Sequence, residues 1–119
     1  MIISKKISFD AAHRLPNYDG KCANLHGHHW IVELAVRGEV SKETGMVVDF
    51  TLLKEFLESI RNTFDHHLVN EIIENPTAEN ICKYIFNRYW SGDCKLPILL
   101  SLEFIRVWET EDSYAELRN

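Results

Sequence analysis

The segment Ile2-Ile3-Ser4-Lys5-Lys6-Ile7-Ser8-Phe9-Asp10-Ala11-Ala12-His13 decides the fold class, because apolar and polar residues alternate along most of it. Positions 3, 7, 9 and 11 are apolar, with Lys5 as the one interruption, and the even positions from 4 to 10 are polar. Side chains two residues apart lie on the same face of a strand, so this period indicates a half-buried strand. We expect that strand over residues 2–14.

The same alternation predicts a second strand over residues 26–38, where apolar side chains occupy the even positions from 30 to 36. Residues 15–25 between the two strands contain Pro, Asn, Asp and Gly, so they are expected to form a loop. Near the end of the chain, two more strands are expected over 98–109 and 113–118, joined by a short hairpin loop.

A helix is expected between the two pairs of strands. Apolar side chains recur at a spacing close to 3.6 from residue 52 to residue 64, which gives a helix one apolar face. Asp49 or Thr51 is a suitable cap for its start, and its end is expected near Asp65. The preceding residues 46–50 are expected to be a short strand or an extended lead-in.

Thr77 is expected to open a second helix, which stops at Ser91-Gly92. Cys82 falls on the apolar face of this helix, so core packing is its expected role. Strands therefore cluster at both ends of the chain, with the helices between them. This order lacks βαβ alternation and predicts an α+β fold, a four-stranded antiparallel sheet with two helices packed on one face.

Composition limits the classes of function. The 119 residues are enough for one domain, 1–119, and the net charge of −5 argues against a broad electrostatic binder of nucleic acid. No apolar run reaches 18 residues and the first residues lack the apolar core of a signal peptide, so neither a membrane span nor secretion is expected. Cys22, Cys82 and Cys94 form no CxxC pair, and reduced thiols in the cytoplasm are the simplest interpretation.

Three of the six histidines have the same parity as the apolar residues of their expected strands. His26 and His28 lie two residues apart, and His13 continues the apolar parity of the first strand. If the two strands are neighbours, three imidazoles can converge on one metal ion and leave a coordination position open, as in catalytic zinc sites. The alternative is that these are ordinary polar residues at strand ends. His29 has the opposite parity and is not expected to be a ligand.

Three further features have a functional and an ordinary interpretation. Cys22 in its polar loop is either an activated thiol beside a metal or an incidental cysteine, and the latter is favoured without context. Asp65 followed by His66 is either an acid that orients a proton-relay imidazole or a favourable pairing with a helix C-terminus. Glu109 shares parity with Ile105 and Val107, so its carboxylate is either directed inward toward a ligand or exposed at a strand end.

Taken together, the sequence resembles the 6-pyruvoyltetrahydropterin synthase / 6-carboxytetrahydropterin synthase family along nearly the whole chain. The matching segments occur in the family's order and comprise residues 9–15, 22–28, 45–50, 52–54, 65–68, 75–80 and 107–110. A single His-Gly-His would be a weak signal, whereas the ordered set is highly specific.

The resemblance implies the roles of the site residues. His13, His26 and His28 match the family's zinc ligands, with Zn²⁺ as the implied cofactor. The implied catalytic residues are Cys22, Asp65, His66 and Glu109, with Cys22 as the thiol and His66 as its relay partner. Glu109 also matches the carboxylate that grips the pterin, and Thr77 and Glu79 are the other implied substrate-binding residues.

The resemblance also implies the reaction. Family members act on 7,8-dihydroneopterin triphosphate. The short spacing of three residues between Cys22 and His26 resembles that of one branch of the family. Members of this branch release triphosphate and acetaldehyde and give 6-carboxy-5,6,7,8-tetrahydropterin, toward queuosine and related 7-deazapurines. The alternatives are the branch that gives 6-pyruvoyltetrahydropterin and a non-catalytic zinc- or pterin-binding module. The acidic net charge is unexpected for a triphosphate substrate, and Lys5, Lys6, Arg14 and Lys21 are the candidates for local positive charge.

The implied architecture is the tunnelling fold (T-fold), in which trimers close a shared barrel and two trimers stack into a hexamer. Closure through neighbouring subunits agrees with the need to cover two open sheet edges. Because sites in this family lie at subunit interfaces, residues of one chain are expected to complete a neighbour's site.

Overall fold

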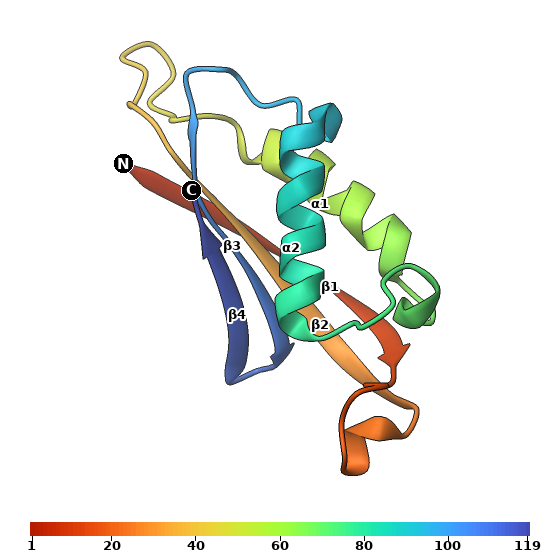
Figure 1. Ribbon diagram of the computed structural model, residues 1–119. Helices are drawn as coiled ribbons and strands as arrows, with labels where there is room; N and C mark the ends of the chain where they lie inside the picture. Colours follow the sequence, from red (N-terminus) through yellow and green to blue (C-terminus); the bar gives the residue numbers. More distant parts are fainter.

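The computed structural model describes residues 1–119 and consists of one sheet covered by two helices (Figure 1). The antiparallel sheet has the order β1-β2-β3-β4. Its strands are β1 (Ile2–His13), β2 (His26–Arg37), β3 (Ser101–Thr110) and β4 (Ser113–Arg118). Helices α1 (Phe50–Phe64) and α2 (Ala78–Arg88) cover the same face, which confirms the predicted α+β arrangement.

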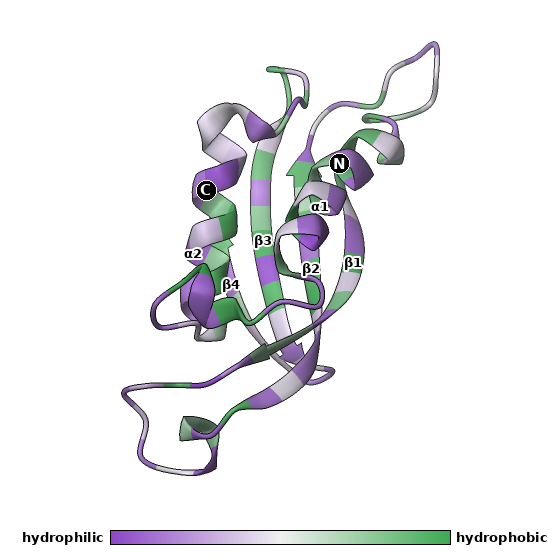
Figure 2. Cartoon of the chain, turned by 90° about the vertical axis from the view of Figure 1, so that its right-hand side faces the viewer, coloured by the Kyte–Doolittle hydropathy of each residue, from purple (hydrophilic) through white to green (hydrophobic).

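The hydrophobic core lies between this face of the sheet and the helices. The parity expected for β1 is confirmed, because Ile7, Phe9 and Ala11 are buried and pair with Val32, Trp30 and His28 across the strand boundary. Twenty buried residues form one cluster with contributions from all these elements except β4. Figure 2 shows the resulting pattern, with hydrophobic and hydrophilic bands alternating along β3.

Both helices begin at a side-chain cap. Asp49, one of the two expected caps of α1, accepts a hydrogen bond from the Thr51 backbone N–H at 2.8 Å. Thr77 caps α2 by accepting one from the Asn80 N–H at 3.1 Å. These bonds satisfy N–H groups that have no partner inside the helix. Neither helix is long and apolar enough to span a lipid bilayer.

Several expected boundaries are wrong. Of the two alternatives for residues 46–50, the strand is wrong, because Met46 uses its carbonyl oxygen locally, to accept from the Ser41 N–H, and no strand lies beside it. These residues lead into α1, and Asp49 has an extended backbone. β1 ends at His13 rather than at residue 14. β3 spans Ser101–Thr110 rather than 98–109, since a turn closed by the Leu100 N–H and the Pro97 carbonyl precedes it.

The helical run ends at Ser91-Gly92 as expected, but the second helix changes type before that point. α2 ends at Arg88 and continues as a π-helical turn, η3 (Tyr89–Asp93). Gly92 ends this turn with φ of 100°, a left-handed conformation that glycine adopts without the steric cost of a Cβ atom.

Two β-bulges alter the parity of β3. Glu103 is the extra residue between the pairs Val36–Leu102 and Ala35–Phe104, so Leu102 and Ile105 both reach the core. Glu109 is the extra residue between the pairs Trp108–Tyr114 and Thr110–Ser113. Bulges are frequent beside functional sites, where they redirect a side chain. The second bulge lies at the end of the sheet that carries the histidines.

Candidate functional site

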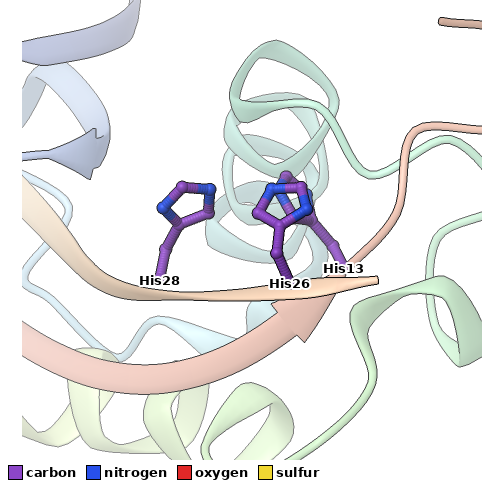
Figure 3. A group of neighbouring side chains, drawn as sticks. All are labelled: His13, His26 and His28. Atoms are coloured by element: carbon purple, nitrogen blue, oxygen red, sulfur yellow. The ribbon is translucent and has the colours of Figure 1, made fainter. Parts of the chain in front are cut away.

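The three histidines of matching parity form a cluster at one end of the sheet (Figure 3). His13 pairs with His26 and Ala11 pairs with His28, so the register places all three side chains on the helix-covered face. One ring nitrogen from each lies within 4.8 Å of the others, an arrangement that can hold a metal ion. The prediction that these side chains converge is confirmed.

Backbone carbonyl groups orient two of the rings. His13 Nδ1 lies 2.8 Å from the Pro76 carbonyl oxygen, and His26 Nδ1 lies 2.7 Å from that of Asn24. A carbonyl oxygen only accepts, so each Nδ1 carries the proton and each neutral ring leaves Nε2 with a free lone pair. These two Nε2 atoms lie 3.0 Å apart, where lone pairs repel unless a proton or a metal ion lies between them.

The donor set fits a metal ion such as zinc. Two ligands with Zn–N bonds of 2.0–2.1 Å in a tetrahedral site are about 3.3 Å apart, close to the His13–His26 separation. His28 Nε2 is buried and has no hydrogen-bond partner. Burial also lowers the pKa of His13 and of His28, which favours the neutral form that binds metals.

Trp30 forms the floor of the cluster. Its ring stands edge-on to those of His13 and His28, with centroids 5.0 and 5.4 Å away, and its Nε1–H donates to the Ala11 carbonyl at 3.2 Å. This fully buried indole restricts the rotation of both imidazoles. His29, in contrast, bonds Asp10 through Nδ1 at 2.8 Å and takes no part in the cluster, as its opposite parity predicted.

Glu109 lies beside the cluster. Its Oε1 is 3.7 Å from His28 Nε2, and its side chain is 30% exposed. Glu109 also lines a cleft of about 430 Å³ together with Ala78 and Glu79 at the start of α2 and Tyr114 of β4. The Thr77 hydroxyl next to this cleft accepts the capping hydrogen bond described above. The carboxylate is thus directed toward the histidines, while Glu79 is an exposed lining residue.

Cys22 lies in the loop between β1 and β2, within a single 3₁₀ turn, η1 (Lys21–Ala23). Its carbonyl oxygen accepts from the Leu15 N–H at 2.9 Å, which fixes the base of the loop. The thiol is partly exposed and makes no hydrogen bond. By comparison, Cys82 is buried, its Sγ bonds the Ile105 carbonyl, and burial raises its pKa to about 11, so its predicted core role is confirmed.

Asp65 and His66 form the expected pair at the end of α1. His66 Nδ1 lies 3.0 Å from Asp65 Oδ1, and the same oxygen accepts from the Asp10 N–H at 3.1 Å. The His66 N–H in turn donates to the Asp10 carbonyl at 2.7 Å. The backbone of β1 therefore holds this pair from both sides. His66 has φ of 59°, a conformation that is sparsely populated by non-glycine residues and is concentrated at functional sites.

The Asp65–His66 pair makes no hydrogen bond to the other candidate site residues within one chain. His66 opens on a cleft of about 690 Å³ that His28 of the histidine cluster also lines, together with Gly27 and His29 of the opposite parity. The His66 imidazole is 78% exposed and bonds neither Cys22 nor the three histidines. Within one chain the pair therefore borders the same cleft as His28 without a hydrogen bond to Cys22 or to the histidine cluster.

Sequence reasoning missed the groups that orient the site. The carbonyl oxygens of Pro76 and Asn24 hold imidazoles through the backbone, which leaves no residue-type signal. Asp10, which links His29 to the Asp65–His66 pair, was assigned only to the polar face of its strand. A polar residue three positions before a metal ligand is a signal that could have drawn attention to Asp10.

Comparison with known proteins agrees with this geometry. The family model described as 6-pyruvoyl tetrahydropterin synthase matches residues 2–119. A protein of Archaeoglobus fulgidus, provisionally named 6-carboxy-5,6,7,8-tetrahydropterin synthase, is 44% identical over 99% of this chain and 96% of its own length. The Synechocystis protein of that name is 38% identical over 95% of this chain and 92% of its own length.

Two further relatives are informative. The dihydroneopterin monophosphate aldolase of Pyrococcus furiosus is 36% identical over 94% of this chain and 92% of its own length. The structure of Caenorhabditis elegans 6-pyruvoyl tetrahydropterin synthase superposes with a TM-score of 0.85 at 29% identity, covering 100% of this chain and 95% of that one. Proteins that are similar to this chain are thus named for more than one pterin reaction.

Proposed function

The chain belongs to the 6-pyruvoyl tetrahydropterin synthase family, and we propose that it is a zinc-dependent lyase that converts 7,8-dihydroneopterin triphosphate to 6-carboxy-5,6,7,8-tetrahydropterin, with release of acetaldehyde and triphosphate. The observation that carries the proposal is the cluster of three imidazoles with free Nε2 lone pairs, with the Glu109 carboxylate 3.7 Å away. This arrangement provides a metal site and a ring anchor next to each other.

Glu109 binds the pterin ring in this proposal. A carboxylate accepts two N–H hydrogen bonds from the 2-amino-4-oxo pyrimidine edge in bidentate fashion. The pterin ring occupies the cleft between α2 and β4, on the side of Glu109 that faces away from β1. Thr77 and Glu79 contribute to substrate binding at the start of α2, because Thr77 caps the helix and Glu79 lines the cleft.

His13, His26 and His28 hold Zn²⁺ through their Nε2 atoms. When bound, the ion supplies Lewis-acid chemistry, which lowers the pKa of hydroxyl groups such as those of the substrate side chain. The carbonyl groups of Pro76 and Asn24 keep the ring nitrogens correctly directed, as partners of metal-bound histidines usually do.

Cys22 and His66 transfer protons on either side of the substrate side chain, and Asp65 orients the His66 imidazole. Because the pair makes no hydrogen bond to Cys22 within one chain, we assign Cys22 of one copy and the Asp65–His66 pair of a neighbour to the same site. The free outer edges of β1 and β4 support assembly through neighbouring copies. A hexamer of two stacked trimers is the assembly proposed.

The name of the Pyrococcus relative favours a second candidate, an aldolase acting on dihydroneopterin monophosphate. A 6-pyruvoyltetrahydropterin synthase and a non-catalytic binding module are the remaining alternatives. Acetaldehyde distinguishes them, since only the 6-carboxy reaction releases it. The length of the phosphate chain that the protein accepts separates the aldolase from the two synthases.

The test incubates zinc-loaded protein with the triphosphate and, separately, with the monophosphate of 7,8-dihydroneopterin. Acetaldehyde and the 6-carboxy product are then quantified, with Cys22→Ala as the matched control. Equal amounts of both products from the triphosphate alone would support the proposal. A 6-pyruvoyl product without acetaldehyde, cleavage of the monophosphate alone, or no turnover would each reject it.

The cellular setting follows from the same proposal. The three cysteines are free, which suits a reducing compartment such as the cytoplasm. The product is expected to feed the synthesis of queuosine or a related 7-deazapurine.

A further inference from the structure

Arg14 is the one arginine of the chain without an ion pair. The other five arginines form ion pairs with carboxylates at 2.6–3.4 Å, and they are Arg37, Arg61, Arg88, Arg106 and Arg118. The exposed Arg14 guanidinium has neither a carboxylate within 4.0 Å nor a hydrogen bond. Arginine is the residue that matches phosphate groups in bidentate geometry, so a free guanidinium next to a functional site points to an anionic ligand.

The backbone of Arg14 is nonetheless held firmly. Its N–H donates to Asn70 Oδ1 and its carbonyl oxygen accepts from Asn70 Nδ2, both at 2.9 Å. Arg14 directly follows the metal-binding residue His13, with Cα atoms about 3.8 Å apart. The structure therefore fixes where this side chain begins and leaves its charged end without a partner.

Arg14 lines a cleft of about 810 Å³ whose lining includes the sequence neighbours of His13 and of Pro76. Asn17, Asn70 and Asn75 supply amide groups to the same cleft, and Asn75 precedes Pro76, whose carbonyl holds His13. Arg14 is the only basic residue of the lining, and the carboxylates of Glu71 and Glu74 lie there too. Without Arg14, these two carboxylates would repel an anion.

The other basic candidates are placed less favourably. Lys6 Nζ lies 4.9 Å above the ring of Trp108, and Lys5 pairs with Leu34 near the middle of the edge strand β1, well before His13. Lys21 precedes Cys22 in the loop and is exposed. Arg14 alone among the four lies in a cleft that borders the residues holding His13.

We propose that Arg14 binds the phosphate chain of the pterin substrate, a role that rests on the function proposed above. The side chains of the site follow one another across the sheet, with Glu109 on β3, His28 and His26 on β2, and His13 followed by Arg14 at the end of β1. A ring held at Glu109, with its hydroxyl groups at the histidines, directs its phosphate end past His13 and toward Arg14. Arg14 thereby sets the preference for a phosphorylated pterin over a free one.

The experiment compares zinc-loaded wild type, Arg14→Gln and Arg14→Lys, with Lys83→Gln on the exposed side of α2 as a control of equal charge change. We expect Arg14→Gln to raise the KM for 7,8-dihydroneopterin triphosphate roughly ten- to a hundredfold. Zinc content and the Kd for unphosphorylated 7,8-dihydroneopterin should be unchanged, and Arg14→Lys should recover part of the affinity. The control should resemble wild type.

Inorganic tripolyphosphate tests the site without the pterin. It should compete with the substrate and lose affinity in Arg14→Gln by a similar factor. An unchanged KM and tripolyphosphate affinity, or an equal loss for phosphorylated and unphosphorylated pterin, would overturn the assignment of Arg14. If wild type binds tripolyphosphate through Arg14 but neither binds nor converts a pterin, the proposed function fails while the anion site stands.

Discussion

The Nε2 atoms of His13 and His26 lie 3.0 Å apart, while the Nδ1 atom of each ring donates to a backbone carbonyl. Two neutral imidazoles oriented in this way cannot hydrogen-bond to each other. A metal ion between the two Nε2 atoms would bind both lone pairs at this separation. The arrangement is therefore preorganised for a metal ion, since the ligands need little movement to bind it.

The first prediction concerns His26→Ala. We expect this variant to lose the bound zinc and all turnover but to keep its fold, because His26 is partly exposed and lies outside the hydrophobic cluster. Metal analysis of the purified variant measures the zinc content, and circular dichroism measures whether the fold is kept. Full zinc content together with full activity would remove the site as described.

The second prediction is a pH dependence of the metal-free protein. The folded-state pKa values of His13 and His28 lie below their ordinary 6.5, mainly through burial. The unfolded chain therefore takes up protons that the folded chain refuses, and stability should fall as the pH drops below about 6.5. Urea unfolding at pH 7.5 and pH 5.5 measures the effect. The variant His29→Gln, which leaves the His13 and His28 rings in place, should show the same fall.

The third prediction assigns the thiol to chemistry. Cys22→Ala should retain zinc and bind pterin but lose turnover by a factor on the order of 10² or more, the scale expected for loss of a proton-transfer group. Zinc content, pterin affinity and kcat are the three measurements. A fall in zinc stoichiometry would instead make Cys22 a fourth ligand and the site a closed, structural one.

The fourth prediction concerns Glu109→Gln, which keeps the shape of the side chain but replaces an acceptor with a donor facing the ring N–H groups. Pterin affinity should fall by about 1.5–3 kcal/mol, the range for a hydrogen bond to a charged group, with zinc content unchanged. Titration of a non-reactive pterin analogue gives the affinity. Equal binding by both proteins would show that the ring is not anchored at Glu109.

The fifth prediction tests the sharing of sites between subunits. Cys22→Ala and His66→Ala should each be inactive alone, whereas subunits mixed by co-unfolding and refolding should regain activity. Random mixing of equal amounts gives about a quarter of the sites both intact residues, if each comes from a different copy. Absence of recovery in mixed oligomers of confirmed composition would mean that both residues act within one chain.

Alternation along β1 and β2 predicted that the three imidazoles converge if the strands are neighbours, because parity and antiparallel register together determine which side chains share a face. The same reasoning was incomplete for β3. Glu109 lies toward the site, as its parity with Ile105 and Val107 suggested, yet it is itself a bulge residue. A bulge depends on pairing with both neighbouring strands, which the local sequence does not encode.

The expectations that failed also depended on contacts that the local sequence does not encode. Residues 46–50 contain the apolar, β-branched residues of a strand, but no neighbouring strand is available to pair with them. The lack of a hydrogen bond between Cys22 and His66 could not be read from the order of motifs, and in the proposed function their contact depends on how copies assemble. Arg14 was one of four basic candidates until its missing ion pair and its cleft were visible.

The Pro76 carbonyl joins two parts of the molecule that are usually considered separately. It holds the His13 imidazole, and the next residue, Thr77, caps the helix that lines the cleft beside Glu109. The position of the first turn of α2 and the orientation of the His13 ring are therefore set by consecutive residues. If the proposed function holds, a substitution that loosens this turn would weaken pterin binding and zinc binding together.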